Sequence, residues 1–364
     1  MHLNPSASSW TCVSQYDPQV LRFHQSQIAY KPTPLTSLPR LAEELRVGHL
    51  LVKDESYRLG LPSFKILGAS WAVWRAVCAK LELPYESTTM AAAGRAARAS
   101  NLRIVTCTEG NWGEAVSKMS WELTIPVKVF VPSFMNEETQ AKMFDLGAEV
   151  LVLSGDYDTC IAFAKADSEK TGSILMLDTS WPRYTEIPQW VTDGYSTMLA
   201  EVDQQVESLV SKPVTHSIAS VGVGSWAQAV VAHYKGHSAR ASVITVEPEA
   251  AGSLYASLAA DEVVPIKTGE TIMCGMNCGT TSAIAWPFLR NGVDASVLIS
   301  DREAHKAVEY LNIAGVDSGP CGAAPFAALR KFHRLDRSAL NLGKDSVVVL
   351  FSTEGPRRYP VPSS

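Results

Sequence analysis

The sequence lacks the features that would assign it to a membrane, secreted or nucleic-acid-binding class. No uninterrupted apolar run reaches the roughly 18 residues needed to span a bilayer, so we expect no transmembrane segment. The opening stretch, MHLNPSASSW, has no basic region followed by an apolar one, which argues against a secretory signal. The net charge of -5 shows no excess of basic residues, so we expect neither nucleic acid nor a membrane as a partner.

Cysteine is present, but without the spacing of a disulfide framework or a zinc site. The chain has seven cysteines, an odd number, and Cys274 and Cys278 lack the second pair that a zinc site would need. We therefore expect no bound metal. Reduced thiols are typical of intracellular proteins, so the cytoplasm is the expected location.

What is present is the composition of an ordinary globular protein, with 46% hydrophobic and 19% charged residues. A length of 364 residues is long for one core and favours two domains. From about residue 50 onward, short apolar segments alternate with helical ones, which predicts an α/β fold with doubly wound parallel sheets. Ligands of such sheets bind beyond the carboxyl ends of the strands, so residues that follow strands are the functional candidates.

The segments were assigned from their periodicity and their stop signals. We expect strands at 49–54, 103–108, 127–132, 149–154, 173–178, 216–221, 242–247 and 346–351, and helices at 64–81, 111–123, 136–146, 157–170, 185–209, from 225, 302–313 and 322–334.

Lys65 follows the first of these strands, in the stretch KDESYRLGLPSFKILGASWAVW. A lysine at a helix start usually lies on the surface, with its stem along an apolar face. Here the neighbours Phe64 and Ile66 are apolar, and Gly60 allows a close approach of the backbone. Burial in general lowers the pKa of an amine, and a neutral amine is what Schiff-base chemistry requires.

Two strand-to-helix turns are further candidates. In TEGNWGEA (108–115), glycines flank Asn111, which favours either an ordinary capped helix or an asparagine facing a ligand. In SVGVGSWAQA (220–229), Gly222 and Gly224 would let backbone N–H groups converge at a helix start, which favours a phosphate site. The same stretch fits G-x-G-x-x-A, with Glu247 at the end of the next strand, so a dinucleotide site and a plain tight turn both stay open.

Thr353, in FSTEGP, would place a hydroxyl beyond the last strand, although by itself this stretch is only a turn. A lysine, an asparagine, a phosphate cradle and a hydroxyl together suit one ligand, pyridoxal 5′-phosphate. The lysine would form an imine with its aldehyde, and the asparagine would bond its ring hydroxyl oxygen. The glycine loop would hold the phosphate, and the threonine would meet the pyridine nitrogen.

The sequence resembles the fold-type II pyridoxal-phosphate enzymes, the tryptophan synthase β-like superfamily, and among them the diaminopropionate ammonia-lyase family. The resemblance runs from about residue 29 to residue 356. Its motifs, in order, are YKPTPLTSLPRLAEEL, LVKDESYRLGLPSFKILGA, LDTSWPRYTEIPQWVTDGYSTM, VITVEP, TIMCGMNCGTTS and FSTEG.

The resemblance implies a role for each candidate residue. Lys65 is the expected Schiff-base lysine, Asn111 contacts the cofactor ring, and Thr353 faces the ring nitrogen. The phosphate is expected on Gly222, Val223, Gly224, Ser225 and Trp226. The resemblance further implies a large cofactor-binding domain from residues 1–59 and 179–364, a smaller mobile domain from 60–178, and a homodimer.

The turn around Asn111 departs from the family pattern T-D-G-N-H-G. Glu109 stands where the family has an aspartate thought to act as a second base, and Trp112 stands where it has a histidine. Asp178, in LDTSW, matches a second family aspartate. We expect Lys65 to remove the α-proton, and Glu109 or Asp178 to supply protons or hold a β-ammonium.

The expected activity is an α,β-elimination on a small amino acid, with 2,3-diaminopropionate giving pyruvate and ammonia. Four alternatives stay open on the same cofactor: β-replacement, serine or threonine dehydration, racemisation, and retention of the cofactor without turnover. A nicotinamide oxidoreductase is a remote alternative, because it would leave Lys65 and Asn111 without a role.

Overall fold

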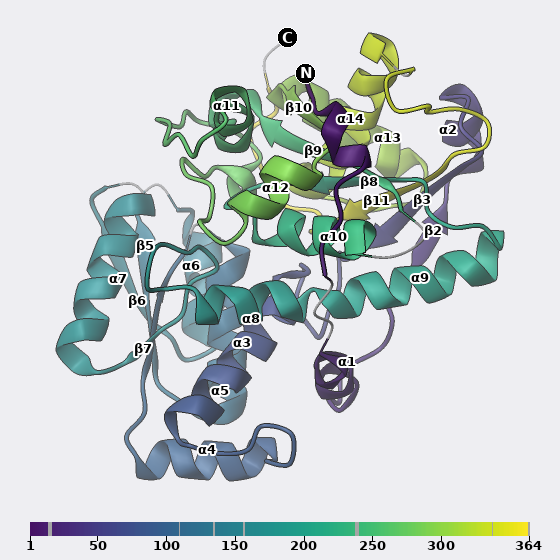
Figure 1. Ribbon diagram of the computed structural model, residues 1–364. Coiled ribbons are helices and arrows are strands. Elements are labelled where there is room, and N and C mark those ends of the chain that lie inside the picture. The colour runs from purple at the N-terminus through teal and green to yellow at the C-terminus, as the bar shows by residue number, and fades with distance from the viewer. Residues whose placement is uncertain are drawn as a thin grey trace. The chain divides into compact units, whose positions relative to one another are not determined.

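The computed structural model describes residues 1–13, 17–108, 110–133, 135–155, 157–236, 240–336 and 338–362. The chain divides into two compact units, whose elements are labelled in Figure 1. The larger unit consists of Met1–Asp17, Gln27–Phe64 and Tyr195–Ser364, and the smaller unit of Pro18–Ser26 and Lys65–Gly194. The mobility expected of the smaller domain stays a prediction.

The larger unit is built on a seven-stranded sheet in the order β1-β10-β9-β8-β11-β3-β2. The strands from β10 to β3 run parallel, and the short edge strands β1 and β2 pair antiparallel. The bounds are β1 (His2–Leu3), β2 (Leu35–Ser37), β3 (His49–Asp54), β8 (His216–Ser220), β9 (Ser242–Pro248), β10 (Ala295–Ile299) and β11 (Val347–Ser352).

Helices cover both faces of this sheet, with α13 and α14 on one side and α9 and α10 on the other (Figure 1). Strands β8 and β11 are consequently buried along their whole length, and the apolar run of β11 predicts this burial. The helical bounds are η1 (Pro5–Ser8), α2 (Pro39–Glu44), α9 (Ser196–Val210), α10 (Ser225–Gly236), η2 (Glu249–Ala251), α11 (Ser253–Ala260), η3 (Cys274–Met276), α12 (Trp286–Gly292), α13 (Asp301–Ile313) and α14 (Pro320–Asp336).

The smaller unit is built on four parallel strands in the order β6-β5-β4-β7. Helix α7 packs on β4 and β5 around Val105, Phe130 and Cys160, and α5 also packs on these two strands. The bounds are α1 (Pro18–Gln25), α3 (Lys65–Lys80), α4 (Met90–Ala99), β4 (Ile104–Cys107), α5 (Asn111–Leu123), β5 (Val127–Pro132), α6 (Glu137–Asp145), β6 (Glu149–Leu153), α7 (Tyr157–Thr171), β7 (Ile174–Leu175) and α8 (Glu186–Gly194).

The α/β class with parallel sheets is confirmed, and the expected elements at 49–54, 111–123 and 127–132 match β3, α5 and β5. The single helix expected at 185–209 is wrong, because α8 ends at Gly194 and α9 begins at Ser196. A β-carbon at Gly194 would lie 2.5 Å from the Leu67 carbonyl oxygen, so glycine lets α8 pass very close to α3. The sequence also gave no expectation for α4 or β10.

No helix in the part of the chain that the structure describes is long and apolar enough to cross a membrane.

Candidate functional site

Lys65 is the first residue of α3, and its side chain meets a carboxylate. Nζ donates a hydrogen bond to Asp178 Oδ2 at 2.5 Å, and the two side chains are 17% and 5% exposed. The residues that follow, Ile66 and Leu67, are buried. The Lys65 side chain therefore keeps some access to solvent, beside a nearly buried anion, which suits a lysine that reacts.

The chain approaches Lys65 through a tight reversal. Arg58 and Leu61 exchange backbone hydrogen bonds of 2.8 and 3.0 Å, and Leu59 and Gly60 adopt φ angles of 49° and 84° in the left-handed region. Glycine adopts such angles without strain, whereas the leucine must be held there by its surroundings. Beyond the reversal, the Phe64 N–H donates to the Thr353 carbonyl at 3.2 Å.

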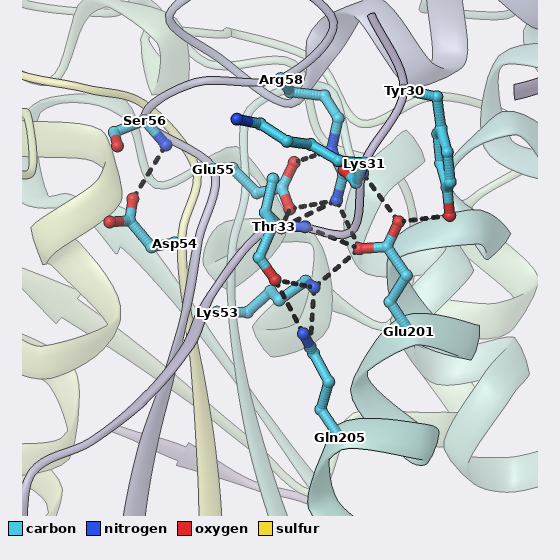
Figure 2. A network of polar contacts seen from close by, with 10 residues as sticks. All are labelled: Tyr30, Lys31, Thr33, Lys53, Asp54, Glu55, Ser56, Arg58, Glu201 and Gln205. Carbon is cyan, nitrogen blue, oxygen red and sulfur yellow. Dashed lines mark hydrogen bonds and ion pairs between the residues drawn. The ribbon is translucent and has the colours of Figure 1, made fainter. Parts of the chain in front are cut away.

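Figure 2 shows a buried network of charges that includes Arg58, the first residue of this reversal. Arg58 donates to both carboxylate oxygens of Glu55 and of Glu201, at 2.6 to 2.8 Å. Lys53 Nζ donates to Glu201 at 2.7 Å, to Gln205 at 2.8 Å and to a backbone carbonyl. The network contains two cations and two carboxylates, all less than 5% exposed, so its charges are balanced within the protein.

The pKa values in this network follow from burial and pairing. Burial lowers the pKa of Lys53, against the opposing charges of Glu201 and Glu55. Burial acts to raise the pKa of Glu201, but hydrogen bonds and charge from Arg58 and Lys53 bring it below its ordinary value. Lys53, Arg58 and Glu201 are therefore charged groups held by their partners within the network.

The segment that carries Asp178 is fixed by hydrogen bonds on both sides. The Tyr184 hydroxyl donates to the Leu175 carbonyl at 2.8 Å and accepts from the Leu177 N–H at 3.0 Å. Thr106 Oγ1 donates to the Met176 carbonyl at 2.5 Å. Burial raises the pKa of Tyr184 far above its ordinary value, so this hydroxyl stays protonated as a donor. Asp178 is thus presented by a rigid stretch of backbone.

The turn before α5 is shaped by Thr108 and Gly113. Thr108 Oγ1 accepts from the N–H groups of Gly110 at 2.9 Å and Gly113 at 3.0 Å. A β-carbon at Gly113 would lie 2.3 Å from the Thr108 side chain, so only glycine fits there. The helix begins at Asn111, as expected. Glu109 lies outside the described residues.

The loop from Gly222 to Trp226 joins β8 to α10, and its glycines leave no room for side chains. Gly224 has a φ of +102°, and a β-carbon there would lie 3.0 Å from Leu289. The first N–H groups of a helix have no partner within the helix, so this end of α10 attracts anions. Val223 and Ser225 are buried beside the glycines.

Thr281 completes this loop, and the sequence reasoning missed it. Its Cγ2 atom lies 3.7 Å from the position that a β-carbon on Gly224 would take, which is an ordinary van der Waals distance. Its hydroxyl is buried and has no hydrogen-bond partner among the described residues. A buried hydroxyl without a partner beside a helix N-terminus fits a bound phosphate, which could accept a hydrogen bond from it. The quoted motif TIMCGMNCGTTS contains Thr281, but the motif alone did not single it out.

Thr353 directly follows β11 and is 3% exposed, so it lies at the carboxyl end of the sheet as expected. Trp226 lies at the same end of the unit, with its ring centroid 4.9 Å from Phe351 and 5.4 Å from Phe64. The larger unit thus carries the glycine loop and Thr353, while the smaller unit carries Lys65, Asp178 and Asn111.

Glu247 has a structural role that removes it from the dinucleotide hypothesis. Its two carboxylate oxygens accept the N–H groups of Leu254 and Tyr255, at 2.7 and 2.8 Å, at the start of α11. Burial raises the pKa of Glu247 to about 8, while these donors act to lower it. A fully buried carboxylate that anchors a helix is not available to a ribose.

Among the described residues, no group of three or more His, Cys, Asp or Glu side chains is placed to hold a metal ion. The seven cysteines are free thiols in the described part of the structure.

A family model described as "Pyridoxal-phosphate dependent enzyme" matches residues 27–353. The diaminopropionate ammonia-lyase of Salmonella typhimurium (strain LT2) is 32% identical over 356 residues, which cover 93% of this chain and 88% of the relative.

Solved structures agree with this match. The diaminopropionate ammonia-lyase from Escherichia coli in complex with D-serine superposes with a TM-score of 0.88 at 28% identity, covering 97% of this chain and 93% of the other. The same enzyme in complex with an aminoacrylate-PLP azomethine reaction intermediate superposes with a TM-score of 0.87 at 28% identity, with the same coverage.

Proposed function

Because the chain belongs to the family of pyridoxal-phosphate dependent enzymes, we propose that it is an ammonia-lyase that acts on a small β-substituted amino acid, first of all 2,3-diaminopropionate. The similarity to the Salmonella lyase extends over most of both chains. The observation that carries the proposal is the contact between Lys65 Nζ and Asp178 Oδ2, which joins a reactive amine to a carboxylate able to receive a second ammonium group.

The cofactor, when bound, supplies an aldehyde that reacts with amines and a ring that withdraws electrons from the α-carbon. Lys65 would hold it covalently, and its amine, once displaced by the amino group of the substrate, would remove the α-proton. Asn111 would contact the ring, and Thr353 would provide a neutral hydroxyl for the ring nitrogen. The loop from 222 to 226 binds the phosphate, and the Thr281 hydroxyl donates to it.

Asp178 explains why a diamino acid suits this chain. In the free protein its carboxylate is neutralised by the Lys65 ammonium. When the lysine amine is engaged elsewhere, the nearly buried carboxylate needs another cation, since an unpaired buried charge is costly. The β-ammonium of diaminopropionate provides that cation, whereas the hydroxyl of serine does not.

Glu109 keeps the role of second acid or base that its place in the motif suggests. We expect Asp178→Asn and Glu109→Gln each to retain the visible absorbance of the bound cofactor and to lower turnover by about 10²-fold or more. Both enantiomers of the substrate should be assayed, because a base opposite Lys65 would serve one of them. Turnover of both enantiomers within about twofold of wild type would remove that residue from the mechanism.

The experiment that tests the function is a screen of amino acids against the purified protein, which follows cofactor absorbance and keto-acid release together. One molecule of diaminopropionate and one of water should give one pyruvate and two ammonia. A product that retains the amino group, formed with added nucleophiles, would instead identify β-replacement. Preferred release of keto acid from serine or threonine would identify a dehydratase.

The assembly and location follow as further parts of the proposal. A homodimer is expected from the family resemblance, and light scattering on the purified protein would measure it. Free cysteines suit a reducing compartment, so the cytoplasm is the expected location, which cell fractionation would check.

A further inference from the structure

The indole of Trp112 is linked to both members of the Lys65–Asp178 pair. Its ring centroid lies 6.0 Å from Lys65 Nζ, the outer limit for attraction between a cation and an aromatic face. Its Nε1 donates to Thr106 Oγ1 at 3.0 Å and to the Met176 carbonyl at 3.3 Å. Met176 lies two residues before Asp178. The ring of Trp112 therefore lies beside Lys65, while its N–H group bonds to the segment that carries Asp178.

The orientation of this ring is fixed more firmly than packing alone would fix it. Trp112 is 4% exposed, and its N–H has two acceptors. The N–H groups of Trp71 and Trp226 are buried as well, but have no hydrogen-bond partner in the described part of the chain. Because Thr106 also bonds to Met176, the indole is locked to the strand that leads to the Asp178 carboxylate.

We propose that Trp112 is a positioning residue for Lys65, and this rests on the proposed role of Lys65 as the lysine that binds the cofactor. A lysine side chain has several freely rotating bonds and loses much entropy when it is held in one place. The indole face beside Nζ limits these conformers while Asp178 attracts the ammonium. The Lys65 side chain is therefore held, before the cofactor binds, in the orientation in which it reacts with an aldehyde.

The test is the rate at which the full-length protein, freed of its cofactor, takes up added pyridoxal phosphate, followed by the visible absorbance of the bound cofactor. Trp112→Leu removes the ring and should slow uptake about tenfold. Trp112→Phe keeps a ring and removes the N–H, so it should restore most of the rate. Thr106→Val removes the main acceptor and should slow uptake by a factor of about two to three.

A matched control separates positioning from simple packing. Trp74→Leu removes another buried indole of the same unit, one that stacks on Phe23 with ring centroids 5.6 Å apart. It should lower the midpoint of thermal unfolding about as much as Trp112→Leu, yet leave the uptake rate within about twofold of wild type.

Two results would overturn the proposal. One is an uptake rate in Trp112→Leu within about twofold of wild type. The other is equal slowing by Trp74→Leu. If Trp112→Leu does not fold, Thr106→Val decides, because uptake at the wild-type rate in that variant would refute the proposal. Cofactor uptake does not depend on turnover. If uptake is slowed in Trp112→Leu while the wild-type protein releases no keto acid, the positioning role of Trp112 stands and the lyase activity is refuted.

Discussion

Lys53 and Lys65 lie twelve positions apart in one motif, and the structure treats them in opposite ways. Lys53 is fully buried and donates three hydrogen bonds of 2.7 to 2.8 Å to Glu201, Gln205 and a backbone carbonyl. Lys65 is 17% exposed beside the Asp178 carboxylate. Both lysines form a salt bridge, so the presence of an ion pair alone does not identify the lysine that reacts.

The two side chains differ in their burial and in the groups that surround them. A lysine with all three donors bound cannot turn toward a ligand without leaving buried acceptors unpaired, which is costly. Under the proposed function Lys65 leaves Asp178, and that carboxylate is then available to a substrate ammonium. The network around Lys53 includes Arg58, the first residue of the reversal, whereas the proposed function assigns the chemistry to Lys65.

The largest expected effect breaks the reactive side of this comparison. Lys65→Ala should abolish covalent binding of the cofactor and lower turnover by about 10³-fold or more, since both imine formation and proton removal depend on its amine. Steady-state kinetics and the absorbance of the bound cofactor measure both. Undiminished turnover in this variant would show that another lysine reacts.

The next effect breaks the structural side. Lys53→Met should lower the free energy of unfolding by about 3–5 kcal/mol, because it leaves the buried network with two carboxylates and a single cation, Arg58. Denaturant unfolding measures this, and Lys142→Met, which breaks an exposed ion pair with Glu138, serves as the control with a much smaller loss. Similar losses at the two positions would contradict the structural role of the buried network.

The same network predicts a dependence on pH. Because the pKa of Glu201 lies below 4.5 in the folded protein, its contribution to stability is present above pH 4.5. That contribution is lost as the pH falls through the folded pKa. Lys53→Met should therefore flatten the stability profile of the protein in acid.

A smaller effect is expected where the phosphate would bind. Gly224→Ala puts a side chain into a left-handed position and against Leu289, and should weaken cofactor binding about tenfold. Gly147→Ala is the matched control, because Gly147 has a φ of +78° but nothing within 4 Å of an added β-carbon. An equal loss of cofactor affinity in the two variants would show that backbone strain alone, and not contact with Leu289, causes the loss.

The smallest effect gives a baseline for a purely structural loss. Ser300 and Glu303 form a capping box at the start of α13. Ser300→Ala should lower the free energy of unfolding by about 1 kcal/mol, while cofactor affinity and turnover stay at the wild-type level. A change in turnover would mean that a loss of stability far from the site is enough to lower activity, so the effects of the other substitutions on turnover would not be specific.

Much of this arrangement could be predicted from local sequence, and the rest depends on residues far apart in the chain. Strand β5 and helix α5 match their predictions, because periodicity and glycine turns are local signals. The break after Gly194 was not predicted, and the close approach of this glycine to Leu67 is a contact that no window of sequence contains. Lys53 meets Glu201 across 148 positions, so the pattern around Lys53 could not tell a structural lysine from a reactive one.

The candidate site divides in the same way. The sequence singled out Lys65 and the glycine loop, because chemistry and turn geometry both leave traces in neighbouring residues. Thr281 and the anchor of Trp112 on Thr106 and Met176 became visible only in three dimensions.

The central claim, that Lys65 and not Lys53 binds the cofactor, is tested most directly by reducing the purified holoenzyme with borohydride and mapping the labelled peptide by mass spectrometry. We predict a pyridoxyl group on Lys65 and none on Lys53. A label on Lys53, or on any other lysine in place of Lys65, would contradict the account.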